Sequence, residues 1–169
     1  MGPMAQFSLR KDEKELIVRD WCVELHASSD SKAFEGDVTG RRFSNPVAYH
    51  ISQTSQDVVH YLFSEEDDPE VPESLDDLCR LIALQQSRPS DAFASFFQLR
   101  NIVFSHVKKD SLNDKVFSRI NDRIDACTLR AMDNYMRFRE QVMQYRIDEL
   151  KMSLGAFGRS GASRSKMGA

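Results

Sequence analysis

The residue whose position most suggests chemistry is Arg100, a cation within a strongly apolar stretch. On a helical projection it lies in the middle of the stripe that contains Phe96, Phe97 and Val103. A guanidinium buried there without a partner would lose hydration worth several kcal/mol, so it needs an anion or a route to water. Asp125, which lies among apolar residues on the last helical stretch, is the best candidate partner.

Arg100 has two interpretations. In the structural one, which we favour, a carboxylate holds the arginine, or its aliphatic stem packs on apolar neighbours while the charged group reaches water. In the functional one, Arg100 lines a pocket with Asp125 and with Tyr135 or Arg139, and the pocket receives a small anion or acid. The functional interpretation predicts a sensor of a small-molecule ligand.

Four histidines raise the question of haem, because a helical cavity with one imidazole is enough for axial ligation. They are His26, His50, His60 and His106. Lone histidines on helices are more often surface residues or satisfied core residues than metal ligands. We therefore expect no cofactor and keep a haem-binding globin-type sensor as a lesser alternative.

Catalysis has no comparable support. Asp125, Asp133, Glu140 and Glu149 invite comparison with a carboxylate bundle, but the Glu-x-x-His pairing of di-iron bundles is missing. The sequence has no phosphate-binding glycine loop, no nucleophile elbow and no paired histidines with a glutamate on one helix face. The acidic run 64–70 lacks the ligand spacing and turn glycine of a calcium loop. We expect no enzymatic activity and no metal.

Composition is typical of a single soluble domain. The 169 residues are 41% hydrophobic and 29% charged, with a net charge of -3, so no electrostatic footprint favours nucleic acid or an anionic membrane. No apolar run approaches the roughly 18 residues of a membrane span, and no signal peptide is recognisable. Cys22, Cys79 and Cys127 are few and far apart, which indicates reduced, buried thiols. We expect a cytoplasmic protein.

Hydrophobic periodicity predicts the elements that position these residues. No segment alternates with period two, so we predict an all-α fold of about five helices with a long C-terminal helix. Asn45 and Pro46 form a start signal for the second helix. The predicted ranges are 9–27, 46–63, 73–86, 88 or 90 to 108, and 113–154. We predict one helical domain over 9–154 and a disordered, Gly/Ser-rich basic tail over 155–169.

The last predicted helix is apolar on two faces and charged on a third. The first face should close the core against the aromatic fourth helix. The second should divide, with Asp125, Leu129 and Met132 inside the domain near Arg100 and the later residues left for a partner. The first face comprises Val116, Ile120, Ile124, Cys127, Ala131, Tyr135, Phe138, Val142 and Tyr145; the second comprises Leu129, Met132, Met136, Met143, Ile147, Leu150 and Leu154.

Several short motifs in the last three predicted helices carry a family resemblance. They are LCRLIALQQ at 78–86, PSDA at 89–92, FFQLR at 96–100, RID at 123–125, DNYM at 133–136, RE at 139–140 and RIDE at 146–149. Over residues 13–152 the chain resembles the N-terminal domain of RsbRD-type RsbT co-antagonist proteins. The resemblance implies a stress-response regulator with a globin-like fold that holds no haem.

In longer relatives of this family the domain is an input module, joined through its last helix to a phosphorylatable sulfate-transporter-and-anti-sigma-antagonist domain. No such output domain follows in this sequence, so the resemblance implies a stand-alone sensor-like or adaptor protein. We predict that it docks on a protein partner or a second copy of itself through Met143, Ile147, Leu150 and Leu154. The alternative is a scaffold subunit of a larger complex.

Overall fold

The computed structural model describes residues 9–28, 45–85, 88–107 and 113–164, with side chains up to residue 155. Within these ranges the chain forms five helices and no strand, so the all-α prediction is confirmed. The helices are α1 (Lys11–Ser28), α2 (Pro46–Leu62), α3 (Ser74–Leu84), α4 (Pro89–His106) and α5 (Asp114–Arg164).

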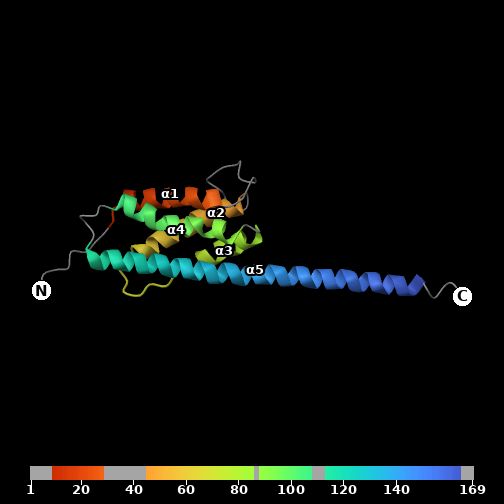
Figure 1. Cartoon of the computed structure of the whole chain (residues 1–169). Helices are drawn as coiled ribbons and strands as arrows, with labels where there is room; N and C mark the ends of the chain where they lie inside the picture. The colour runs from red at the N-terminus through yellow and green to blue at the C-terminus, as the bar shows by residue number, and fades with distance from the viewer. Residues whose placement is uncertain (1–8, 29–44, 86–87, 108–112, 165–169) are drawn as a thin grey trace.

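The four shorter helices pack along the first part of α5, which then continues alone toward the C-terminus (Figure 1). Phe138 is the last buried residue of α5 among those whose side chains are described. We call α1–α4 together with α5 up to Phe138 the body, and the rest of α5, residues 139–164, the projecting segment. This division determines which side chains of α5 are available to a partner.

Two asparagines begin helices by accepting backbone hydrogen bonds. The side chain of Asn45 accepts from the Ala48 N–H at 3.1 Å, and Pro46 occupies the first helical position, as predicted. Asn113 does the same for α5, where the Val116 N–H donates to its side chain at 2.8 Å. These caps satisfy amide donors that have no carbonyl partner inside the helix.

Aromatic packing joins α1, α4 and α5 in the core. Trp21 is fully buried, its indole N–H donates to the Ser95 carbonyl at 3.0 Å, and its ring packs edge-on against Phe96 with centroids 5.7 Å apart. Phe93 packs edge-on against Tyr135 of α5 at 5.3 Å. The prediction that the first face of α5 closes the core against the aromatic helix therefore holds here.

The predicted end of the last helix is wrong. Helical backbone continues from Leu154 through Gly155 to Arg164, into the stretch predicted to be a disordered tail. Residues 165–169 lie outside the described residues. A Cβ at Gly155 would meet nothing within 4 Å, so close packing does not require a glycine at this position. The treatment of 9–154 as a single domain stays a prediction.

All three cysteine thiols are buried or partly buried, which lowers their reactivity. Cys79 and Cys127 are buried, and burial raises the pKa of each to about 12. Cys22 is partly buried, and burial raises its pKa as well. Because the thiolate is the nucleophile, these cysteines are protonated and unreactive at neutral pH. This agrees with the predicted reduced, buried thiols.

A hydrogen bond between side chains connects the end of α4 to α1. His106 Nε2 lies 2.7 Å from a carboxylate oxygen of Asp20, whose other oxygen accepts two hydrogen bonds from Arg19. The hydrogen bond from His106, followed by that from Arg19, holds the pKa of Asp20 below its usual value against the opposing effect of burial. The ionised form of Asp20 therefore stabilises the fold.

The first prediction concerns Asp20 and acid. A carboxyl whose pKa is lower in the folded state contributes stability above its unfolded pKa and loses it as the pH falls through the folded pKa. Urea unfolding between about pH 5 and pH 3 should therefore show a steeper loss of stability for the wild type than for Asp20→Asn. Asp67→Asn, in an exposed loop, should follow the wild type. Equal slopes for Asp20→Asn and the wild type would contradict this assignment.

Candidate functional site

The second face of α5 is exposed along its whole length. It includes three residues on the body, Leu129, Met132 and Met136, and four on the projecting segment, Met143, Ile147, Leu150 and Leu154. Their exposed fractions range from 42% to 71%. We call these seven residues the apolar stripe. At 1.5 Å per residue it is roughly 40 Å long.

The structure corrects two expectations about α5. Leu129 and Met132 were expected inside the domain, but both are exposed, and none of the described helices covers their side of α5. The first face was expected to remain in the core through Tyr145, yet Tyr145 is 75% exposed because the body ends before it. The apolar stripe is therefore longer than predicted, and the core face is shorter.

Charged residues flank the stripe asymmetrically. At 100° per residue, Asp133 and Glu140 lie along one edge of the stripe, whereas Arg139 and Arg146 lie along the other. The Asp133, Glu140 and Arg146 side chains are exposed, and that of Arg139 is partly exposed. Between residues 133 and 146 the stripe therefore has one acidic edge and one basic edge; further along, the exposed Lys151 lies on the same side as Asp133.

Arg100 pairs with Asp125, as predicted. Its Nη2 donates to an Asp125 carboxylate oxygen, which joins α4 to α5. The pair is not buried, since the two side chains are 45% and 61% exposed, so the predicted burial of Arg100 is wrong. Phe97, one turn away on the same face of α4, is also exposed. This surface of the body opens to solvent beside the start of the stripe.

The predicted ligand residues form two separate pairs. Tyr135 is buried, and its hydroxyl accepts a hydrogen bond from Arg139 at 2.6 Å. Asp125 and Tyr135 lie ten residues apart on one helix, which corresponds to roughly 15 Å. The structure therefore brings Arg100 to Asp125 and Arg139 to Tyr135, and it does not gather the four around one point. Anion binding at Arg100 stays a prediction.

Arg123 of α5 makes a set of buried hydrogen bonds that the sequence did not predict. It is 5% exposed, and its guanidinium donates to the carbonyls of Tyr61, Leu62, Ser64 and Glu66 at 2.6 to 3.2 Å. Burial, with the nearby Arg119 cation, lowers its pKa. Arg123 thus binds the last carbonyls of α2 and those of the loop that follows, where few amide donors are available; the Tyr61 carbonyl also accepts from the Ser64 N–H at 3.3 Å.

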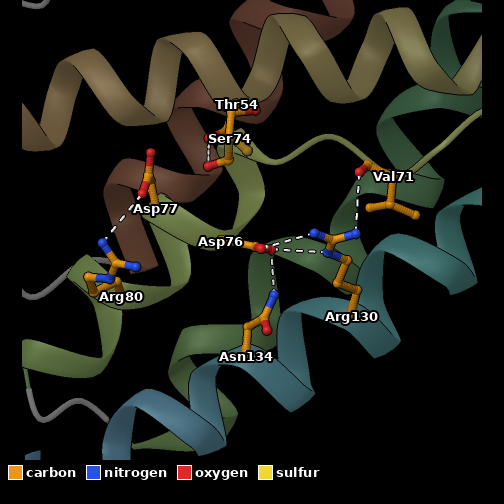
Figure 2. Close-up of polar contacts among 8 residues, drawn as sticks. All are labelled: Thr54, Val71, Ser74, Asp76, Asp77, Arg80, Arg130 and Asn134. Atoms are coloured by element: carbon orange, nitrogen blue, oxygen red, sulfur yellow. Dashed lines mark hydrogen bonds and ion pairs between the residues drawn. The ribbon is translucent and has the colours of Figure 1, made fainter.

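A second arginine of α5 binds the start of α3 (Figure 2). Arg130 donates from Nε and Nη2 to the two carboxylate oxygens of Asp76 at 3.0 and 2.9 Å, and Asn134 donates to the same carboxylate. Nη1 of Arg130 reaches the Val71 carbonyl at 3.5 Å. A bidentate pair of this kind fixes orientation as well as distance. Arg123 and Arg130, two turns apart, therefore set the rotation of α5 against the body.

Metal and membrane sites find no support in the described part of the chain. No group of three or more His, Cys, Asp or Glu residues there could hold a metal ion, and no helix there is long and apolar enough to cross a membrane. His106, one of the four haem candidates, is engaged with Asp20.

Comparison with models of known protein families shows which family this chain belongs to. The family model described as the RsbT co-antagonist protein rsbRD N-terminal domain matches residues 15–150. The chain belongs to this family. The match runs from Glu15 in α1 through α2–α4 to Leu150 in α5, so an RsbRD N-terminal domain includes nearly all of the body and most of the apolar stripe. No curated protein and no solved structure matches the chain, and the globin-like likeness stays a prediction.

Membership gives this RsbRD N-terminal domain a coarse function. The family consists of regulatory domains of stress-signalling, partner-switching systems, which act through contacts with other proteins and are not known as enzymes. Arg123 and Arg130 hold α5 in a fixed position against α2 and α3, and the apolar stripe is an exposed surface on the same helix. α5 therefore combines a fixed attachment to the body with an exposed apolar face.

The second prediction tests the Arg123 anchor. Arg123→Met keeps the aliphatic length but leaves buried carbonyls without donors, so it should reduce the free energy of unfolding by about 3 kcal/mol in urea denaturation. Lys115→Met, at an exposed position on the same helix, should change it by less than about 0.5 kcal/mol. An Arg123→Met protein as stable as Lys115→Met would show that the four contacts contribute nothing.

Proposed function

We propose that this RsbRD N-terminal domain is a non-enzymatic regulatory input module that docks through the apolar stripe of α5, and that its partner is a second copy of the chain. The observation that carries the proposal is the exposure of seven apolar side chains on one helix face. An exposed apolar strip of this length is unusual on a monomer and is typical of a contact surface.

The spacing of the stripe suits pairing between helices. Leu129, Met136, Met143 and Leu150 recur every seven residues, and Met132 follows the first of them by three. A spacing of seven residues brings side chains back to nearly the same side of a helix, so these four lie along one line that a second helix can follow. The stripe begins on the body and continues on the projecting segment, so a paired helix would contact both.

Charge complementarity favours a second copy in a parallel arrangement. A two-fold axis along the helices places the acidic edge of one stripe, with Asp133 and Glu140, against the basic edge of the other, with Arg139 and Arg146. An antiparallel pair would place acidic against acidic and basic against basic. Opposite charges across the edges of a helix pair set partner choice and orientation.

Two alternatives use the same residues differently. A scaffold subunit would cover the stripe with an unrelated protein. A small-molecule sensor would bind an anion at Arg100 in place of Asp125. Replacing Arg100 by Met separates the sensor from the dimer, because it removes the cation and leaves the stripe intact.

The third prediction tests the stripe. Ile147→Asp would bury two carboxylates in the dimer and should weaken association by on the order of 100-fold, as measured by sedimentation equilibrium. Met152→Asp is the matched control, because Met152 is 73% exposed on the opposite face of the same helix. Both variants should keep the helical content of the wild type. Equal association for the two variants would contradict the proposed interface.

The fourth prediction tests the orientation. Glu140→Arg and Arg146→Glu should each weaken the dimer by about threefold, and the double variant should recover the wild-type affinity, because opposite charges again face each other. The same sedimentation measurements provide the comparison. A single variant that strengthens association would indicate the antiparallel arrangement instead.

A further inference from the structure

Sulfur is distributed unevenly over this molecule. The thiols of Cys79 and Cys127 are buried, and that of Cys22 is partly buried. The thioethers of Met132, Met136 and Met143 are 42%, 48% and 55% exposed. An oxidant in solution therefore reaches these methionines before it reaches the buried cysteines. Burial also raises the pKa of all three thiols, which keeps them in the less reactive protonated form.

The exposed methionines share one surface. Met132, Met136 and Met143 are three of the seven residues of the apolar stripe, and they occupy its first two thirds. Met132 and Met136 lie on the body and Met143 lies just beyond it, so they span the point where α5 leaves the other helices (Figure 1).

We propose that Met132, Met136 and Met143 form an oxidation site through which hydroperoxides control docking of α5. The inference rests on the proposed function, since it regulates the same stripe. The methionine sulfur donates an electron pair to the terminal oxygen of a hydroperoxide. The S–O bond forms as the O–O bond breaks, the sulfur is oxidised, and the peroxide is reduced to water or an alcohol once the proton of the transferred hydroxyl moves to the leaving oxygen.

The product changes the surface in a defined way. A sulfoxide is a polar hydrogen-bond acceptor, whereas the thioether is apolar, so burying it against a second apolar stripe leaves the new oxygen without a donor. Three such groups in each chain alter the part of the stripe beside the body. Methionine sulfoxide is reversible by dedicated reductases, so the change can act as a switch.

The chain contains its own control. Met152 is 73% exposed on the opposite face of the projecting segment, so it should oxidise at least as readily without touching the stripe. Oxidation of Met152 alone should leave association unchanged. Replacement of the stripe methionines by leucine removes the oxidisable sulfur and retains an apolar side chain of similar size.

The experiment treats the dilute full chain with hydrogen peroxide, counts sulfoxides by peptide mass spectrometry, and measures the association constant by sedimentation before and after. We expect oxidation at Met132, Met136, Met143 and Met152, unchanged far-ultraviolet circular dichroism, and association weakened by at least about tenfold. Methionine sulfoxide reductases should reverse the loss. The M132L/M136L/M143L variant should keep its dimer in peroxide, and M152L should behave as the wild type.

The outcomes separate this inference from the proposed function. A reduced chain that stays monomeric contradicts both. A reduced dimer that survives full oxidation of the three methionines overturns only the inference. A triple-leucine variant that loses its dimer in peroxide as the wild type does also overturns it, because the effect would then arise elsewhere in the chain.

Discussion

The structure depends on how α5 is held by two arginines. Arg123 donates hydrogen bonds to carbonyls at the buried end of α2, and Arg130 binds the carboxylate of Asp76 at the start of α3. These contacts lie on one side of α5, seven residues apart, so they set both its position and its rotation. Once they are made, the face with Ile120, Ile124 and Cys127 must enter the core, and the apolar stripe must face outward. Exposure of the stripe is thus a consequence of the anchors.

Much of this arrangement could be predicted from periodicity, because the spacing of apolar residues along a helix shows which of its faces is apolar. The five helices, the Asn45 cap and the core residues of α5 up to Phe138 follow from spacing and residue type. The pairing of Arg100 with Asp125 also follows, because an arginine in an apolar stretch requires an anion. A projection does not reveal which neighbour covers each face, and this is why Arg100 was expected to be buried and Leu129 to lie inside.

The role of Arg123 could not be predicted in the same way. Its partners are backbone carbonyls, and carbonyls carry no signature in the sequence. Asp76 and Arg130 are 54 residues apart, and only the packing of α3 on α5 brings them together. The available signal was indirect: Arg123 lies next to Ile124 on the core side of α5, where an unpartnered cation would be costly. The end of α5 was missed because Gly155 and the serines near it are weak helix formers.

These features divide α5 into a half that packs in the body on one face and a projecting half, and we propose that the apolar stripe along both pairs with a second copy of the chain. Hydrogen–deuterium exchange of the unmodified protein over a range of concentrations tests this division most directly. The account predicts that amides between Ile120 and Phe138 are protected at every concentration, whereas those between Val142 and Leu154 exchange rapidly in dilute solution and become protected as concentration rises. Exchange between Val142 and Leu154 that is independent of concentration would contradict it.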